Sequence, residues 1–223
     1  LNPQAIEMPL ELNGALNFDA LNSSLFIDAP VSGPHGITKT GANRLELTAN
    51  NSYTGDTAIT TGTLSIGDGD VTGSIDPTGT VSFGAGTTTR LEINRSDNKT
   101  LANAITTGGR ANVAAIGGQT VTLSGPITGT GEFWTHGPGT IQIEPNAGSA
   151  SFATSVVVAT GTLEVADFST STLGTGGFFI GQAGNGTLRY TGPTASTDRV
   201  GAYALQGVGT NTFIEVTTPS TEL

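Results

Sequence analysis

Residues 36–66 read GITKTGANRLELTANNSYTGDTAITTGTLSI, in which short runs of alternating apolar and polar residues are separated by Gly- and Asn-containing corners. In residues 44–48 (RLELT) the apolar side chains recur at every second position, as they do again in residues 140–144 (TIQIE). This period of two is typical of a β-strand with one buried face. The pattern predicts short strands joined by tight turns, and no stretch has the periodicity of a long amphipathic helix.

The composition agrees with an all-β chain. The 223 residues include 33 Gly, and Thr is more frequent still. Thr is β-branched and favours strands, whereas Gly suits tight corners. Charged residues make up 12% of the chain, about half the share of roughly 25% that globular proteins have. These proportions predict many strands packed around a thin, elongated core.

Two segments of the chain repeat the same pattern. A first copy spans about residues 33–69 and a second about residues 125–174, with TGTLSI at 61–66 matching TGTLEV at 160–165. A looser third copy lies around residues 186–190. Each copy is a pair of alternating strands joined through a Gly-containing corner. Internal repetition of this kind indicates a solenoid, in which each unit packs on its neighbours.

We predict one all-β segment over residues 1–223, folded as a right-handed parallel β-helix. Strands start roughly every 7 to 13 residues, a spacing that β-sandwiches share, so a β-sandwich remains the alternative. The long, imperfect repeat favours the solenoid, with coils of about 20 to 25 residues. The N-terminus has neither an initiator Met nor the pattern of a signal peptide, which indicates a fragment excised from a larger protein.

Residues 36–64 resemble the autotransporter-associated β-strand repeat, whose pattern is G-L-T-K-x-G-x-G-x-L-x-L-x-x-x-N-x-Y-[ST]-G-x-T-x-[IV]-x-x-G-T-L. Nearly every position is met, and Asn43 stands where the family usually has Gly. The second copy has NAGS at residues 146–149 in place of the N-x-Y-T-G corner. Residues 91–105 also look like segments that accompany such repeats.

The resemblance implies a passenger segment of a type V secretion protein, or of a large surface or secreted protein of bacteria. It implies a right-handed β-helix that acts as a rod or scaffold and that aids export and folding. The expected location is therefore the bacterial cell surface or the extracellular space. The expected partners are the rest of a larger polypeptide and host-surface or polysaccharide ligands.

Charge and cysteine content exclude several other classes of function. The net charge is −10, and the eight basic residues are scattered, so nucleic acid is not an expected partner. No run approaches the roughly 18 apolar residues of a membrane span, so no membrane insertion by this segment is expected. The absence of Cys excludes disulfides, thiolate metal sites and a cysteine nucleophile.

Two groups of residues resemble metal ligands. Asp68, Asp70 and Asp76 alternate with Gly as calcium-binding loops do, but no Glu stands at the twelfth position of the loop. Because Asp and Gly are also ordinary turn residues, a solvated turn is the favoured interpretation. His35 and His136 are the only histidines, and neither has a second ligand at the spacing that zinc needs. No metal or cofactor is therefore expected.

The aromatic pair Phe133 and Trp134 is a candidate for sugar binding. In an alternating strand one ring faces the core and the other faces solvent. A single outward ring can stack on a carbohydrate, although a lone aromatic side chain is more often part of the packing. An adhesin or carbohydrate-binding module is therefore the alternative function.

A local mixture of charges is the remaining candidate for chemistry. Arg90, Arg95 and Lys99 lie near Glu92 and Asp97. Some β-helix enzymes cleave acidic polysaccharides with clustered carboxylates and bases, so a polysaccharide-degrading enzyme is a further, less favoured alternative. Solvation and weak ion pairing at the surface are the favoured explanation of the mixture, and no repeated carboxylate pattern is present. The sequence predicts no catalytic residue and no enzyme.

Overall fold

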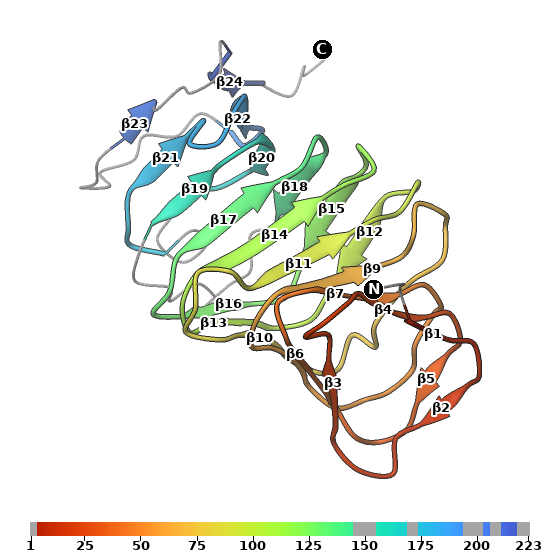
Figure 1. Cartoon of the computed structure of the whole chain (residues 1–223). Helices are drawn as coiled ribbons and strands as arrows, with labels where there is room; N and C mark the ends of the chain where they lie inside the picture. Colours follow the sequence, from red (N-terminus) through yellow and green to blue (C-terminus); the bar gives the residue numbers. More distant parts are fainter. Residues whose placement is uncertain (1–3, 145–154, 169–173, 194–202, 206–210, 218–223) are drawn as a thin grey trace.

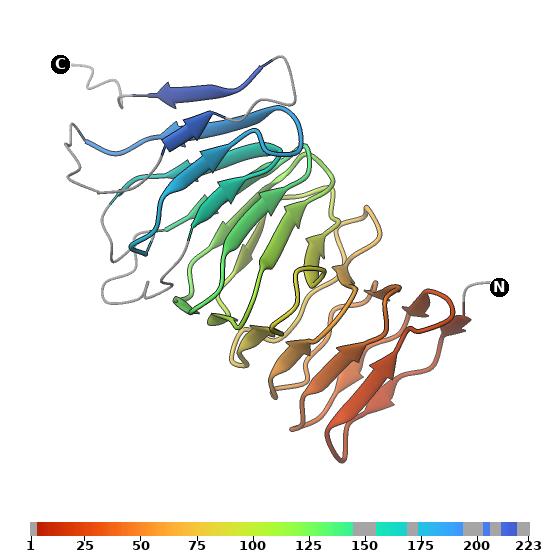
Figure 2. The ribbon, with the colours of Figure 1, turned by 60° about the vertical axis from the view of Figure 1, so that its left-hand side comes forward.

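The computed structural model describes residues 4–144, 155–168, 174–193, 203–205 and 211–217. In this part of the chain all regular secondary structure is β-strand, and every pairing between strands is parallel. The strands stack along one axis, with the first and last strands at opposite ends (Figure 2). The arrangement is a β-solenoid.

One face of the solenoid is a ten-stranded sheet, called the long sheet below (Figure 1). Each strand is one passage of the chain across that face. Leu45 pairs with Leu64 and Leu64 pairs with Leu91, so successive coils here contain 19 and 27 residues. In stacking order the strands are β1 (Gln4–Ile6), β4 (Leu25–Ile27), β7 (Arg44–Leu47), β9 (Thr63–Ile66), β11 (Arg90–Ile93), β14 (Ala111–Ala115), β17 (Phe133–His136), β19 (Val156–Val158), β21 (Phe178–Ile180) and β23 (Tyr203–Leu205).

Two six-stranded sheets and one short strand pair form the other faces. The N-terminal sheet contains β3 (Leu16–Asp19), β6 (Ile37–Thr40), β8 (Thr57–Ile59), β10 (Val81–Phe83), β13 (Ile105–Thr107) and β16 (Ile127–Gly129). The C-terminal sheet contains β12 (Lys99–Leu101), β15 (Thr120–Leu123), β18 (Thr140–Ile143), β20 (Gly161–Val165), β22 (Gly186–Tyr190) and β24 (Phe213–Val216). The short pair is β2 (Leu10–Glu11) with β5 (Val31–Ser32).

The core is a set of apolar rows that run along the solenoid axis. Leu45, Leu64, Leu91 and Val113 are in register on the long sheet, and all four are fully buried. Burying one such side chain contributes about 1.5–3 kcal/mol. Each row is continued by every new coil, so the core is long and thin, as the composition predicts.

The fold prediction is confirmed in its class. The chain is a parallel β-solenoid, and a sandwich would need antiparallel pairs, which do not occur among the described strands. The alternating runs predicted at residues 44–48, 140–144 and 186–190 are the strands β7, β18 and β22. The right-handed sense of the winding stays a prediction.

The two repeat copies occupy different corners of the solenoid. The first leads from β6 on the N-terminal sheet to β7 on the long sheet, and the second leads from β17 on the long sheet to β18 on the C-terminal sheet. Both turns need a glycine with positive φ, at Gly41 (78°) and Gly137 (91°). The shared sequence pattern thus encodes a corner with its two flanking strands, and the chain uses that corner on two edges of the solenoid.

Candidate functional site

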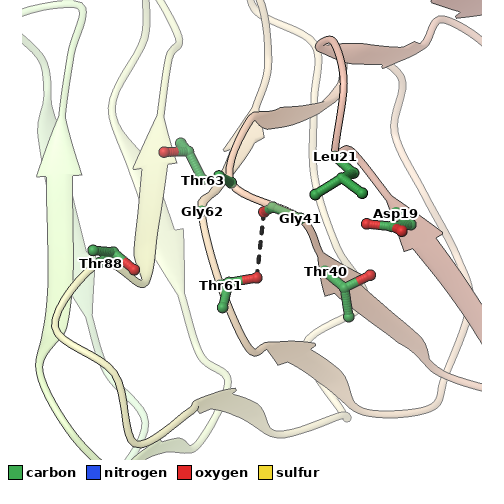
Figure 3. Close-up of a pocket in the computed structure, with 9 residues that line it drawn as sticks. Asp19, Leu21, Thr40, Gly41, Thr61, Gly62, Thr63 and Thr88 are labelled. Atoms are coloured by element: carbon green, nitrogen blue, oxygen red, sulfur yellow. Dashed lines mark hydrogen bonds between the residues drawn. The ribbon is translucent and has the colours of Figure 1, made fainter.

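A groove of about 550 Å³ lies at the corner where the N-terminal sheet meets the long sheet, and we call it the corner groove (Figure 3). It is formed by the same corner of successive coils, each of which contributes one short segment. Neighbouring strands lie about 4.8 Å apart, so the groove follows the solenoid axis. Its lining residues are Asp19, Leu21, Thr40, Gly41, Ala42, Thr61, Gly62, Thr63 and Thr88.

Glycines form the floor of the corner groove. Gly41 and Gly62 have φ values of 78° and 70°, which side chains rarely tolerate. A Cβ on Gly41 would lie 2.6 Å from the Asp19 carboxylate, and one on Gly62 would lie 2.4 Å from the Gly41 carbonyl oxygen. The corners therefore approach so closely that only glycine fits, and the Asp19 carboxylate occupies space above Gly41.

A buried lysine lies beneath this floor. Lys39 has no exposed surface, and its Nζ donates to the carbonyl oxygens of Thr40 and Gly41 at 2.7 Å and of Thr61 at 3.2 Å. Burial lowers the pKa of Lys39 to about 8, and the charge of Asp19 partly opposes that shift. Lys39 thus joins the corners of two neighbouring coils through their backbone.

Sequence analysis missed the role of Lys39, although one signal was available. Lys39 is two residues after Ile37, and Ile37 is a core residue of the same strand. With a period of two, the lysine must also point inward. It pairs with Phe18 on one side and Ile59 on the other, so the lysine stands between two apolar neighbours.

The open side of the corner groove carries unpaired polar groups. The side chains of Asp19, Thr63 and Thr88 have no hydrogen-bonding partner among the described residues. By contrast, the hydroxyl of Thr40 donates to Asn17 Oδ1 at 2.9 Å, and that of Thr61 donates to the Gly41 carbonyl oxygen at 3.3 Å (Figure 3). The groove therefore presents one carboxylate and two free hydroxyls to solvent.

The remaining wall is apolar. Leu21 is 60% exposed. Its carbonyl oxygen accepts a 2.8 Å hydrogen bond from Asn43 Nδ2, and the backbone N–H of Asn43 donates to the Ala20 carbonyl oxygen at 2.9 Å. Asn43 thus holds the segment that places Leu21 beside the groove.

The acidic loop behaves as a turn. Asp68 and Asp70 are exposed, and Asp68 Oδ1 accepts from the backbone N–H of Asp70 at 3.4 Å. Asp76 accepts hydrogen bonds from the hydroxyl and the backbone N–H of Thr78, which lower its pKa. Over the described ranges no three His, Asp or Glu side chains come together as a metal site would need.

The two histidines are distant in sequence and lie in different environments. His35 is exposed at a corner. His136 is half-buried on the outer face of the long sheet, where its Nε2 lies 3.0 Å from Asn112 Oδ1. Burial lowers the pKa of His136 to about 4, and the charges of Arg90 and Arg110 add to that shift. His136 is therefore neutral at physiological pH.

The aromatic pair is divided between core and surface as predicted. Phe133 is fully buried and Trp134 is half-buried on the outer face. The guanidinium of Arg110 lies 3.7 Å from the centre of the indole ring, and Trp134 Nε1 donates to Glu132 at 2.9 Å. Arg110 covers one face of the indole ring, and Glu132 accepts the hydrogen bond of the single indole N–H. Trp134 therefore packs within the surface of the sheet.

The mixed charges separate into two independent ion pairs. Arg90 Nε lies 2.8 Å from Glu92, on the outer face of the long sheet. Arg95 is buried and contacts both carboxylate oxygens of Asp97, at 2.8 and 2.9 Å. The hydrogen bond from Arg95 lowers the pKa of Asp97, and burial lowers that of Lys99. Glu92 and Asp97 are thus held by different arginines, and these ion pairs do not bring their two carboxylates together.

Comparison with known proteins gives two matches. Residues 37–66 match the model of the passenger-associated transport repeat. The chain is also 32% identical over 209 residues to the adhesin BmaC autotransporter of Brucella suis biovar 1 (strain 1330). That alignment covers 83% of this chain and 6% of the relative, so the chain spans a small part of the relative's length. No solved structure matches, and none of the described residues forms a helix long and apolar enough to cross a membrane.

Proposed function

We propose that this chain, which is an autotransporter passenger repeat protein, serves as a structural segment that carries other regions of a passenger away from the cell. The observation that carries the proposal is the uninterrupted long sheet, in which ten parallel strands follow one another without an antiparallel partner. A stack of this kind can be extended by any number of coils, because each coil contacts only its neighbours.

The same architecture suits a role in export and folding. Every coil offers a strand edge on which the next segment of chain can pair. Pairing of successive coils then proceeds in one direction along the chain, with contacts between segments only 19 to 27 residues apart, as in Leu45, Leu64 and Leu91. Short closure distances favour fast pairing. A chain that emerges from a secretion pore in extended form would fold coil by coil on this template.

The proposed location is the bacterial cell surface or the extracellular space, as part of a longer polypeptide. The passenger-repeat match and the name of the relative support the location. The relative's much greater length supports the longer polypeptide. A non-enzymatic role agrees with the separate ion pairs of the two carboxylates, since Glu92 pairs with Arg44 and Arg90 whereas Asp97 pairs with Arg95.

An adhesive role is the second candidate, and one observation favours it. The relative is named an adhesin, and the corner groove offers this chain a surface at which a ligand can bind. A rod and an adhesin are compatible, because the outer faces of a β-helix are free to carry binding residues while the core keeps the coils together.

Small-angle X-ray scattering with far-UV circular dichroism on the same sample tests the structural proposal. With ten strands about 4.8 Å apart, the stack should be roughly 45 Å long. A β-rich particle that is clearly longer than it is wide is the expected result. A near-spherical β-rich particle would contradict the rod and favour a compact binding module.

A further inference from the structure

We propose that the corner groove binds a neutral, extended oligosaccharide. Its polar contacts would come from Asp19, Thr63 and Thr88, and its apolar contact from Leu21. The inference goes beyond the structural role, because a rod needs no ligand to separate two regions of a polypeptide.

The shape of the groove selects an extended ligand. Its segments come from the corners after β3, β6 and β8 and before β11, which are consecutive coils. The repeat between coils is about 4.8 Å, close to the length of one sugar residue in a straight chain. A ligand that curls into a helix turns away from the solenoid axis after a few sugar residues. A straight chain that lies along the axis places one sugar residue beside each coil.

The hydrogen-bonding groups of the groove suit hydroxyl groups. A carboxylate accepts from sugar hydroxyls, and a threonine hydroxyl both donates and accepts. The side chains of Asp19, Thr63 and Thr88 can form such hydrogen bonds with a ligand, since they form none with the other described residues. Thr40 and Thr61, which line the same groove, already donate to Asn17 and Gly41. The unpaired groups therefore face the opening and the paired ones hold the corner together.

The apolar wall supplies the second element of sugar recognition, a surface for the C–H face of a ring. Leu21 is 60% exposed, and Asn43 holds its backbone in place. At the matching corner of the second copy, Gly139 stands in the position of Asn43. A glycine has no side-chain amide, so the second corner lacks this hydrogen bond. The corner of the second copy therefore has no wall anchored in this way.

The charge of the groove selects a neutral ligand over an acidic one. No arginine lines it, and Arg44 and Arg90, which flank Thr63 on the neighbouring strands, are held in ion pairs with glutamates. The ammonium of Lys39 points to three backbone carbonyl oxygens beneath the floor. Asp19 is the single charged group at the opening, and the whole chain carries a net charge of −10. A polyuronate or sulfated chain would be repelled at this position.

Calorimetric titration of the full chain with three probes tests the proposal. Cellohexaose is straight and neutral, maltohexaose is neutral and curved, and hexagalacturonate is acidic. Saturable binding of cellohexaose, with clearly weaker binding of the other two, is the expected result. The proposal is overturned if cellohexaose does not bind, if maltohexaose binds equally well, or if hexagalacturonate binds most tightly.

Two substitutions locate the bound sugar. Leu21→Ser and Thr63→Val should each weaken cellohexaose binding by roughly fivefold to tenfold, the range expected for one lost contact. Val71→Ser and Thr106→Val are the matched controls, because Val71 is 61% exposed and Thr106 is exposed, and both lie outside the groove. Circular dichroism of all four variants confirms that they fold.

Equal binding by the groove variants and the wild type would place the sugar elsewhere and overturn the assignment. The rod proposal is tested separately by scattering, so a chain that is elongated but does not bind cellohexaose disproves only the binding site.

Discussion

The guanidinium of Arg44 on β7 forms an ion pair with the carboxylate of Glu92 on β11, across the intervening strand β9. On its way Arg44 contacts the hydroxyl of Ser65 on β9 at 3.2 Å. Glu92 also pairs with Arg90 at 2.8 Å, and its side chain is only 7% exposed. Three consecutive coils are thus joined on the outer face of the long sheet by one nearly buried carboxylate, in addition to their backbone hydrogen bonds.

Glu92→Gln should therefore destabilise the chain. The substitution keeps the shape of the side chain but removes the carboxylate that pairs with Arg90 and one of the two that pair with Arg44, whose other partner is Glu46 at 3.3 Å. We expect a loss of about 2 kcal/mol in the free energy of unfolding, less than the roughly 3–5 kcal/mol for breaking a fully buried pair, because the side chains of Arg44 and Arg90 are 35% and 31% exposed. Urea unfolding followed by circular dichroism measures it.

The matched control for this substitution is Glu215→Gln at the end of the C-terminal sheet. Glu215 pairs with Arg189 at 2.8 Å, but its side chain is 43% exposed. An exposed pair contributes little, so we expect a change below about 1 kcal/mol. Similar losses in both variants would show that burial of Glu92 has no special effect.

The solenoid class was predictable because its signals are local. The alternation in residues 44–48 identifies β7, and the Thr-Gly corners mark where strands end. The alternation does not indicate which sheet of the solenoid a strand joins, since a period of two distinguishes only inward-facing from outward-facing side chains. Residues 37–40 and 133–136 occupy corresponding places in the two repeat copies, yet β6 belongs to the N-terminal sheet and β17 to the long sheet.

The corner groove was not predictable for a related reason. Asp19 and Thr88 are 69 residues apart in sequence and line one groove only because the lengths of the intervening coils bring their corners into line. One of those coils is extended to 27 residues by the loop that contains Asp68 and Asp70. Sequence analysis placed coil length only within a range, and a shift of a few residues would separate the lining groups.

Gly62→Ala tests the close approach of the corners. A Cβ at this position meets the Gly41 carbonyl oxygen at 2.4 Å, and the φ of 70° is unfavourable for alanine. We expect a loss of at least about 2 kcal/mol in the free energy of unfolding. Gly14→Ala is the control, because its Cβ meets nothing within 4 Å. If Gly62→Ala is as stable as Gly14→Ala, the corners are not packed as described.

Lys39→Met tests the buried ammonium. Methionine fills a similar volume, but the carbonyl oxygens of Thr40, Gly41 and Thr61 lose the ammonium as a donor. The Thr40 oxygen keeps the backbone N–H of Ala20 and the Gly41 oxygen keeps the Thr61 hydroxyl. The oxygen of Thr61 loses its donor, which costs about 1–3 kcal/mol, and the apolar side chain offsets part of that cost. We expect a net loss of roughly 2 kcal/mol, measured by urea unfolding at pH 7.

The control for the lysine is Lys99→Met, at a position that is only partly buried. Its loss should be small, within about 0.5 kcal/mol. A Lys39→Met chain that is more stable than the wild type would show that desolvation of the ammonium outweighs its three hydrogen bonds.

The last prediction concerns acid. The pKa of His136 is about 4 in the folded chain, below the ordinary value of 6.5. Between these two values the unfolded chain binds a proton that the folded chain does not, so the free energy of unfolding falls as the pH is lowered from 6.5 to 4. His136→Gln removes this proton uptake and should make the stability less dependent on pH in that window. Urea midpoints at pH 7 and pH 4.5 for both chains measure the difference.

Above pH 6.5 the two chains should keep a constant difference in the free energy of unfolding, because the imidazole is then neutral in both the folded and the unfolded state. Equal pH dependence of the wild type and His136→Gln would mean that His136 takes up its proton freely on the outer face of the long sheet.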